Sequence, residues 1–243
     1  MIEADGGLPG ERLAPDEVFC FACGPGLACF NSCCTGKRLP LLPYDFLRLR
    51  QALDLPPAEV LTRHVELEAD PVSGWPALRI RLTPEGACPF VTPDGCAVYA
   101  HRPTCCRIYP LARAMRPGKH GAPPTEVFLR SETPGCLGWD QPGEMTIETW
   151  IADQGLAPYQ AANNRAARLL LHPARKGKVS LGDQQTHAFL SALYNLEAFR
   201  PLAASPGFGD KFGFDRARVE AALADEEKLL NLGIDWLVKV LFG

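Results

Sequence analysis

The sequence lacks a segment that would cross a membrane or direct secretion. Its longest apolar run near the carboxyl end, residues 234–242, is interrupted by Asp235 and Lys239 and is much shorter than the roughly 20 residues that span a bilayer. The first 17 residues, MIEADGGLPGERLAPDE, contain neither the basic cluster nor the apolar stretch of a signal peptide. We therefore expect a cytoplasmic protein without membrane association, whose residues 1–17 form a flexible tail.

The chain also has little excess charge. Its 25 basic and 28 acidic residues give a formal net charge of −3, and the basic residues are dispersed rather than gathered in a stripe. Nucleic-acid-binding proteins usually present a basic surface, because they must neutralise phosphates. The composition thus disfavours nucleic acid as a partner.

Common catalytic signatures are missing. The sequence contains no G-x-G-x-x-G, Walker loop, G-x-S-x-G or H-E-x-x-H pattern, so nucleotide-binding, hydrolase and metalloprotease functions have no motif to support them. The C-x3-C-x2-C triplet of radical-SAM enzymes is missing too, because Cys29 and Cys33 are followed by Cys34 and not by a cysteine at position 36.

What the sequence does contain is ten cysteines, all between Cys20 and Cys136. In a reducing cytosol, thiols stay reduced unless a metal or a catalytic cycle uses them, which favours metal ligation over disulfide bonds. Soft thiolates select zinc, copper(I) or iron-sulfur clusters, and the short spacings suit four ligands around either zinc or a cluster. Spacing alone does not choose the metal.

Two cysteine doublets, Cys33-Cys34 and Cys105-Cys106, need a separate explanation. Adjacent side chains of an extended backbone point apart, which makes two ligands to one metal ion awkward. One member of a doublet therefore either binds a second metal or stays free.

The pattern of apolar residues predicts the secondary structure. Glycine and proline at positions 24–26 indicate a ligand-bearing loop. Short helices are expected from Pro43 and Pro57, and strands over 78–82 and 126–130. Further helices are expected over 146–154, 158–171, 183–199 and 215–232, with Asp183 and Asp215 as N-caps and Gly233 as a helix stop. The expected fold class is α+β: a small, irregular, metal-centred cysteine-rich domain over residues 18–140 with short strands and helices, followed by an all-helical region over residues 141–243.

Residues 96–110 read C-A-V-Y-A-H-R-P-T-C-C-R-I-Y-P. This stretch resembles the C-x-[IV]-Y-x-x-R-P-x-x-C-R-x-[YF]-P signature of the YkgJ-like cysteine-cluster family, described as a zinc- or iron-chelating domain. Cys88-Pro89-Phe90 and the upstream Cys29-x3-Cys33-Cys34 resemble its other two motifs in the same order. The resemblance covers about residues 18–140. It implies eight metal ligands, enough for two four-ligand sites: Cys23, Cys29, Cys33, Cys34, Cys88, Cys96, Cys106 and Cys136.

The chain departs from the family pattern at its opening. The spacing Cys23-x5-Cys29-x3-Cys33 is longer than the commoner C-x2-C-x2-C-C, so Cys20 is an alternative to Cys23. Cys105 lies one residue before Cys106, on which the family's cysteine position falls, and is expected to be an extra cysteine.

Residues other than cysteine in the motif have two interpretations. Arg102 and Arg107 either offset the charge of a four-thiolate site, formally −2 with zinc, or form ion pairs that fix the loop. His101 is expected to face solvent, and Tyr99 and Tyr109 to be packing residues.

Three functions are compatible with the sequence. The first is a protein that binds zinc or iron, the iron as an ion or in an iron-sulfur cluster, to organise its fold or to store metal. The second is an iron-sulfur redox or protein-modifying enzyme related to flagellin lysine-N-methylase, whose branch resembles this family in its cysteine motifs. The third is a thiol-redox or disulfide protein using Cys20-x-x-Cys23. A protein partner that docks on the helical region is left open.

Overall fold

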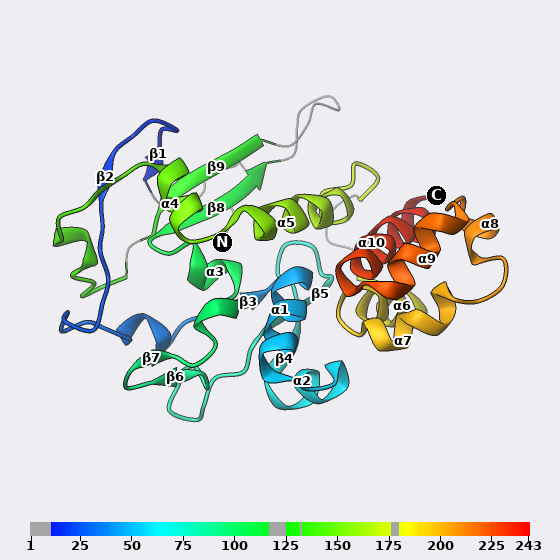
Figure 1. Cartoon of the computed structure of the whole chain (residues 1–243), viewed down its shortest axis with the longest axis horizontal. Helices are drawn as coiled ribbons and strands as arrows, with labels where there is room; N and C mark the ends of the chain where they lie inside the picture. Colours follow the sequence, from blue (N-terminus) through cyan, green and yellow to red (C-terminus); the bar gives the residue numbers. More distant parts are fainter. Residues whose placement is uncertain (1–10, 117–124, 132, 176–179) are drawn as a thin grey trace. The chain divides into compact units, whose positions relative to one another are not determined.

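The structure is a computed structural model that describes residues 11–116, 125–131, 133–175 and 180–243 (Figure 1). The chain divides into two compact units. Unit 1 comprises Met1–Leu39 and Ile80–Pro158, and unit 2 comprises Pro40–Arg79 and Tyr159–Gly243. All ten cysteines lie in unit 1. Residues 40–79 group with the helical part of the chain, and the boundaries of the metal-binding domain at residues 18 and 140 stay a prediction.

Unit 1 contains a three-stranded antiparallel sheet in the order β1-β9-β8. Its strands are β1 (Arg12–Leu13), β9 (Thr125–Arg130) and β8 (Leu111–Arg116). Strand β9 confirms the strand predicted over 126–130. Strand β1 lies within the stretch predicted as a tail, and it pairs with β9 because Leu13 is buried against the core of this unit. Residues 1–10 of that tail lie outside the described residues.

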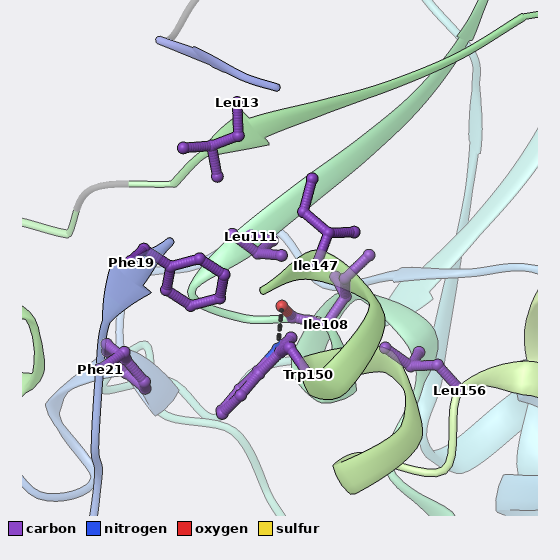
Figure 2. Close-up of a cluster of buried hydrophobic side chains, with 8 residues drawn as sticks. All are labelled: Leu13, Phe19, Phe21, Ile108, Leu111, Ile147, Trp150 and Leu156. Atoms are coloured by element: carbon purple, nitrogen blue, oxygen red, sulfur yellow. Dashed lines mark hydrogen bonds between the residues drawn. The ribbon is translucent and has the colours of Figure 1, made fainter. Parts of the chain in front are cut away.

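Helix α4 (Ile147–Asp153) closes the core of unit 1. Figure 2 shows Ile147 and Trp150 of this helix facing Leu111 of β8 and Phe19, which flanks Cys20. The Trp150 indole Nε1 donates a hydrogen bond of 3.0 Å to the carbonyl oxygen of Ile108 (Figure 2). Because Phe19 and Ile108 lie next to cysteine segments, the core fixes the backbone that carries those cysteines.

Unit 2 combines a small sheet with helices. Strands β3 (Pro40–Leu41), β5 (Pro76–Ile80) and β4 (Val65–Ala69) form the sheet in the order β3-β5-β4. Helices α1 (Pro43–Leu53) and α2 (Pro57–Arg63) begin at the predicted prolines, whose fixed φ suits the first turn of a helix.

The carboxyl-terminal part of unit 2 is all helical, as predicted. It contains α5 (Ala157–Leu170), which begins in unit 1, followed by α6 (Asp183–Leu193), α7 (Leu196–Ala203), α8 (Phe208–Phe212), α9 (Arg216–Ala224) and α10 (Glu226–Phe242). Helix α10 packs against α6, α7 and α9 (Figure 1) and is fixed to α1, where Arg50 pairs with Glu226 and Tyr44 donates to Glu227 at 3.0 Å. Among the described residues, none of the helices is long and apolar enough to cross a membrane.

Two predicted helices are each divided in the structure. The helix expected over 183–199 breaks at Asn195, whose side chain accepts a hydrogen bond from the amide of Ala198 at the start of α7. The N-cap residue of α6 is Gly182, and not Asp183 as predicted. The helix expected over 215–232 begins as predicted with the Asp215 cap. It ends at Asp225, which starts α10 by accepting from the Lys228 amide at 2.8 Å.

Gly233 is not a helix stop but an interior residue of α10. A Cβ atom placed there would lie 2.5 Å from the carbonyl oxygen of Ala192 in α6. The missing side chain therefore permits a close approach of two helices, which is a different use of glycine from the helix end predicted from the sequence.

Candidate metal centre

The first cysteine segment is an irregular loop that other segments hold in place. Strand β2 (Phe19–Cys20) pairs with β10 (Glu144–Met145), and the chain then runs to the 3-10 turn η1 (Ser32–Cys34). Asn31 precedes this turn with a positive φ of 68°, a conformation that asparagine tolerates better than most residues. Its side-chain amide donates to the Thr92 carbonyl at 2.9 Å. The loop is thus fixed to a distant part of the sequence.

The second cysteine segment contains a short hairpin and a helical turn. Strands β6 (Val91–Thr92) and β7 (Gly95–Cys96) form the hairpin that separates Cys88 from Cys96. The turn η2 (Tyr99–His101) and helix α3 (Thr104–Arg107) follow, and α3 carries Cys105 and Cys106. Cys136 lies two residues before the 3-10 turn η4 (Gly138–Asp140). The predicted ligands therefore come from four separate stretches of backbone.

One group of thiols gathers around Cys23. The Ala22 amide donates to the Gly138 carbonyl at 3.1 Å, and the Leu137 amide donates to the Cys29 sulfur at 3.2 Å, so both bonds bring the loop to Cys136. Burial raises the pKa of the Cys23 thiol, and the charges of Cys33, Cys29 and Cys136 raise it further. We call Cys23, Cys29, Cys33 and Cys136 set A.

A second group gathers around Cys88. The Cys88 amide donates to the Cys34 carbonyl at 2.8 Å. Burial raises the pKa of the Cys88 thiol to about 11, with further contributions from Cys106 and Cys96. Burial and the charge of Cys106 raise the pKa of the Cys96 thiol. We call Cys34, Cys88, Cys96 and Cys106 set B.

The two doublets behave differently from isolated thiols. A hydrogen bond from Cys34 lowers the pKa of Cys33 to about 6, and the same bond raises the pKa of Cys34. The sulfur atoms of Cys105 and Cys106 lie 3.9 Å apart, and this contact, with burial, raises the pKa of Cys106. Cys105, expected to be extra, thus contacts a predicted ligand.

Arg102 is the positive charge that the cysteines share. Its charge partly offsets the effects that raise the pKa of Cys23 in set A and of Cys96 and Cys106 in set B, and it contributes to the lowered pKa of Cys33. Its guanidinium lies 3.7 Å from the centre of the Tyr99 ring and donates to the Gln154 side chain at 2.8 Å. These contacts favour charge compensation as the role of Arg102, with Tyr99 packing beneath it.

Arg107 instead fixes the backbone. Its guanidinium donates to the carbonyl oxygens of Gln154 at 2.6 Å and Ala100 at 2.7 Å. Arg107 therefore fixes the loop, which was one of the two interpretations, but it does so through bonds to carbonyl oxygens and not through the expected ion pairs. His101, expected to face solvent, is half-buried in η2.

Two residues near the thiols were missed as functional candidates. Tyr109 lies beside Cys136, since burial and then this thiol raise the pKa of its phenol. Lys37 contributes positive charge that lowers the pKa of Cys33, and its ammonium donates to Thr133 at 3.1 Å. Tyr109 occupies a position of the motif at residues 96–110, which could have marked it as a candidate, whereas nothing in the sequence singles out Lys37.

The donor chemistry of this region fits zinc or iron, although the described residues contain no three Cys, His, Asp or Glu side chains arranged as ligands of one metal ion. All ten cysteines are free thiols. Burial and repulsion between neighbouring thiols disfavour the thiolate forms of five of them, Cys23, Cys34, Cys88, Cys96 and Cys106, and a bound cation offsets both effects. The fit lies in the kind of donors and their gathering, and the eight-cysteine ligand set stays a prediction.

Comparison with known proteins identifies the region. Residues 22–136 match the family model CxxCxxCC, described as "Putative zinc- or iron-chelating domain". These residues belong to that family. No curated protein and no solved structure matched the chain. The matched region of the chelating domain begins one residue before Cys23 and ends at Cys136, so it contains all eight predicted ligands and Cys105 but not Cys20.

Proposed function

We propose that this protein binds zinc or iron through eight cysteines of its chelating domain, the iron either as an ion or in an iron-sulfur cluster. The observation that carries this proposal is that hydrogen bonds join cysteine segments far apart in the sequence: the Leu137 amide, next to Cys136, donates to the Cys29 sulfur, and the Cys88 amide donates to the Cys34 carbonyl. Thiolates of this kind bind zinc, copper(I) or iron-sulfur clusters strongly and magnesium or calcium poorly. The proposed ligands are Cys23, Cys29, Cys33, Cys34, Cys88, Cys96, Cys106 and Cys136.

The bound metal would hold together a region with few regular elements. Strands β6 and β7 have two residues each, and η1 has three. Elements this short contribute little stability by themselves, and metal binding can supply folding free energy directly. The proposal assumes a reducing compartment such as the cytoplasm, where the thiols stay available.

Metal analysis of the full-length chain tests the proposal. We expect stoichiometric zinc or iron after anaerobic purification, and broad visible absorbance if the iron forms a cluster. A colourless protein with zinc would eliminate the iron-sulfur form and, with it, the redox or protein-modifying alternative related to flagellin lysine-N-methylase. A chain that retains no metal, either as purified or after loading, would overturn the proposal.

Substitutions separate ligand cysteines from others. Cys96→Ser and Cys106→Ser should lower the retained metal, because each removes a thiolate from a four-ligand site. Cys20→Ser is expected to keep its metal, since Cys20 lies outside the chelating domain, and loss of metal in it would make Cys20 a ligand in place of Cys23. Equal metal content in all three variants would contradict the assignment.

A further inference from the structure

We propose that the eight cysteines form two interleaved four-thiolate sites, with set A (Cys23, Cys29, Cys33, Cys136) binding one metal and set B (Cys34, Cys88, Cys96, Cys106) binding the other. The adjacent residues Cys33 and Cys34 then serve different metals, and the last cysteine of the chelating domain completes the first site. This inference rests on the proposed metal-binding function.

Two hydrogen bonds bring Cys136 to the first loop. The Leu137 amide donates to the Cys29 sulfur at 3.2 Å, and the Ala22 amide donates to the Gly138 carbonyl at 3.1 Å. Cys23 follows Ala22 directly in the sequence, and Cys136 directly precedes Leu137. The thiols that interact with that of Cys23 are those of Cys33, Cys29 and Cys136, and together they make up set A.

Different contacts draw Cys34 into the second group. The Cys88 amide donates to the Cys34 carbonyl at 2.8 Å, and Thr35 forms an isolated antiparallel bridge with Ala87. The β6–β7 hairpin returns the chain from Cys88 to Cys96. The thiols of Cys34, Cys88 and Cys96 each interact with that of Cys106, which we place with them as the fourth ligand of set B; Cys106 also interacts with Cys33, where the two sets adjoin.

The two proposed sites adjoin at the turn η1, where the Cys33 and Cys34 thiols share a hydrogen bond. Cys33 and Cys34 lie in a 3-10 turn, where consecutive side chains are rotated by about 120° because there are about 3 residues per turn. A division in sequence order would put Cys34 with Cys23 and Cys29, although its backbone is bonded to Cys88. Arg102 acts on thiols of both sets, so one cation serves two negatively charged sites.

Pairs of substitutions distinguish the two ways of dividing the ligands. The reduced full-length chain is loaded with Zn²⁺, freed of excess metal by gel filtration and analysed for zinc per chain. We expect two equivalents in the unmodified chain and in the Cys20→Ser control. We expect one equivalent in Cys29→Ser/Cys136→Ser and one in Cys34→Ser/Cys88→Ser, because each pair removes ligands from a single set. The pair Cys88→Ser/Cys136→Ser removes a ligand from each set and should retain none.

The opposite pattern would overturn the interleaved division. Ligands divided in sequence order would leave one equivalent in Cys88→Ser/Cys136→Ser and none in the other two pairs. Loss of all zinc from every pair would also overturn it, since that result indicates a single cluster with shared thiolates. The equivalent retained by the two within-set pairs shows that each site forms without the other, so loss in the cross-set pair is not general unfolding. An unmodified chain that holds fewer than two equivalents defeats this division, whereas one that never holds any metal defeats the proposed function itself.

Discussion

At the scale of single residues, Arg102 is the side chain whose charge reaches the most thiols. It favours the thiolate form of two cysteines in each set, and a four-thiolate zinc site carries a formal charge of −2. We expect Arg102→Met to weaken metal retention by about 10–100-fold, the usual cost of removing a group that supports metal ligands. Competition with a chromophoric zinc chelator measures this change.

Two further variants make the Arg102 prediction specific. Arg102→Lys keeps the charge but not the planar group over Tyr99, so its effect should be smaller. Arg113→Met removes an arginine of the same unit that pairs with Glu126 at 2.7 Å, and it should leave zinc retention unchanged. Equal retention in Arg102→Met and Arg113→Met would show that the Arg102 charge does not support the metal.

Gly233 provides a prediction for packing in unit 2. Gly233→Ala places a Cβ atom 2.5 Å from the Ala192 carbonyl oxygen, so α10 and α6 must separate. Overpacking of this kind costs about 1–3 kcal/mol, which should exceed the gain in helix propensity of about 1 kcal/mol. Urea denaturation should show a lower midpoint for Gly233→Ala, while Val240→Ala, at an exposed position of the same helix, should stay within about 0.5 kcal/mol of the unmodified chain.

At the scale of secondary-structure elements, the break between α9 and α10 depends on one carboxylate. Asp225 accepts a hydrogen bond from the Lys228 amide at 2.8 Å and starts α10. Asp225→Ala should lower the free energy of unfolding by about 1 kcal/mol, because the cap is lost. Asp225→Asn keeps an acceptor and should cost less. Thermal or urea unfolding of the two variants compares them, and equal losses would show that the side-chain cap does not matter.

The elements also show how far sequence patterns predict this fold. The start of α1 at Pro43 was predicted from the apolar face that begins there, and that of α2 at Pro57 from the proline itself, because proline has a local effect on the backbone. The breaks at Asn195 and Asp225 were missed, although both residues are good N-caps, because the apolar periodicity continued across them. Gly233 was misinterpreted because its role depends on contact with Ala192, a tertiary feature that a local pattern does not contain.

At the scale of the whole molecule, the sequence identified the cysteines but not their grouping. The motif at residues 96–110 was sufficient to predict the chelating domain that the family model matches. Cys136 is far from Cys29 in the sequence and Cys88 is far from Cys34, yet the Leu137 amide donates to the Cys29 sulfur and the Cys88 amide donates to the Cys34 carbonyl. Such long-range pairing depends on how the loops fold back, and spacing between cysteines does not encode it.

Metal removal should therefore affect the two units differently. In unit 1 the cysteine loops are joined by elements of two or three residues, whereas unit 2 has fully buried side chains such as Phe189, Leu229 and Leu237 in its helices. Hydrogen exchange on the full chain, with and without a chelator, should show faster exchange over residues 20–36 and 86–108 after metal is removed. Helices α6 and α10 should keep their protection, because their stability comes from apolar burial.

Residues 40–79 distinguish two descriptions of the part of the chain that bound metal stabilises: the predicted domain over residues 18–140, which contains them, and unit 1, which does not. If that part is residues 18–140, they should lose protection together with the cysteine loops. Because their contacts place them with the helices of unit 2, we expect α1 and β4 to stay protected when the metal is removed. Loss of protection throughout residues 40–79 would show that metal binding stabilises the whole predicted domain, and unchanged exchange in the cysteine loops would show that metal does not organise this fold.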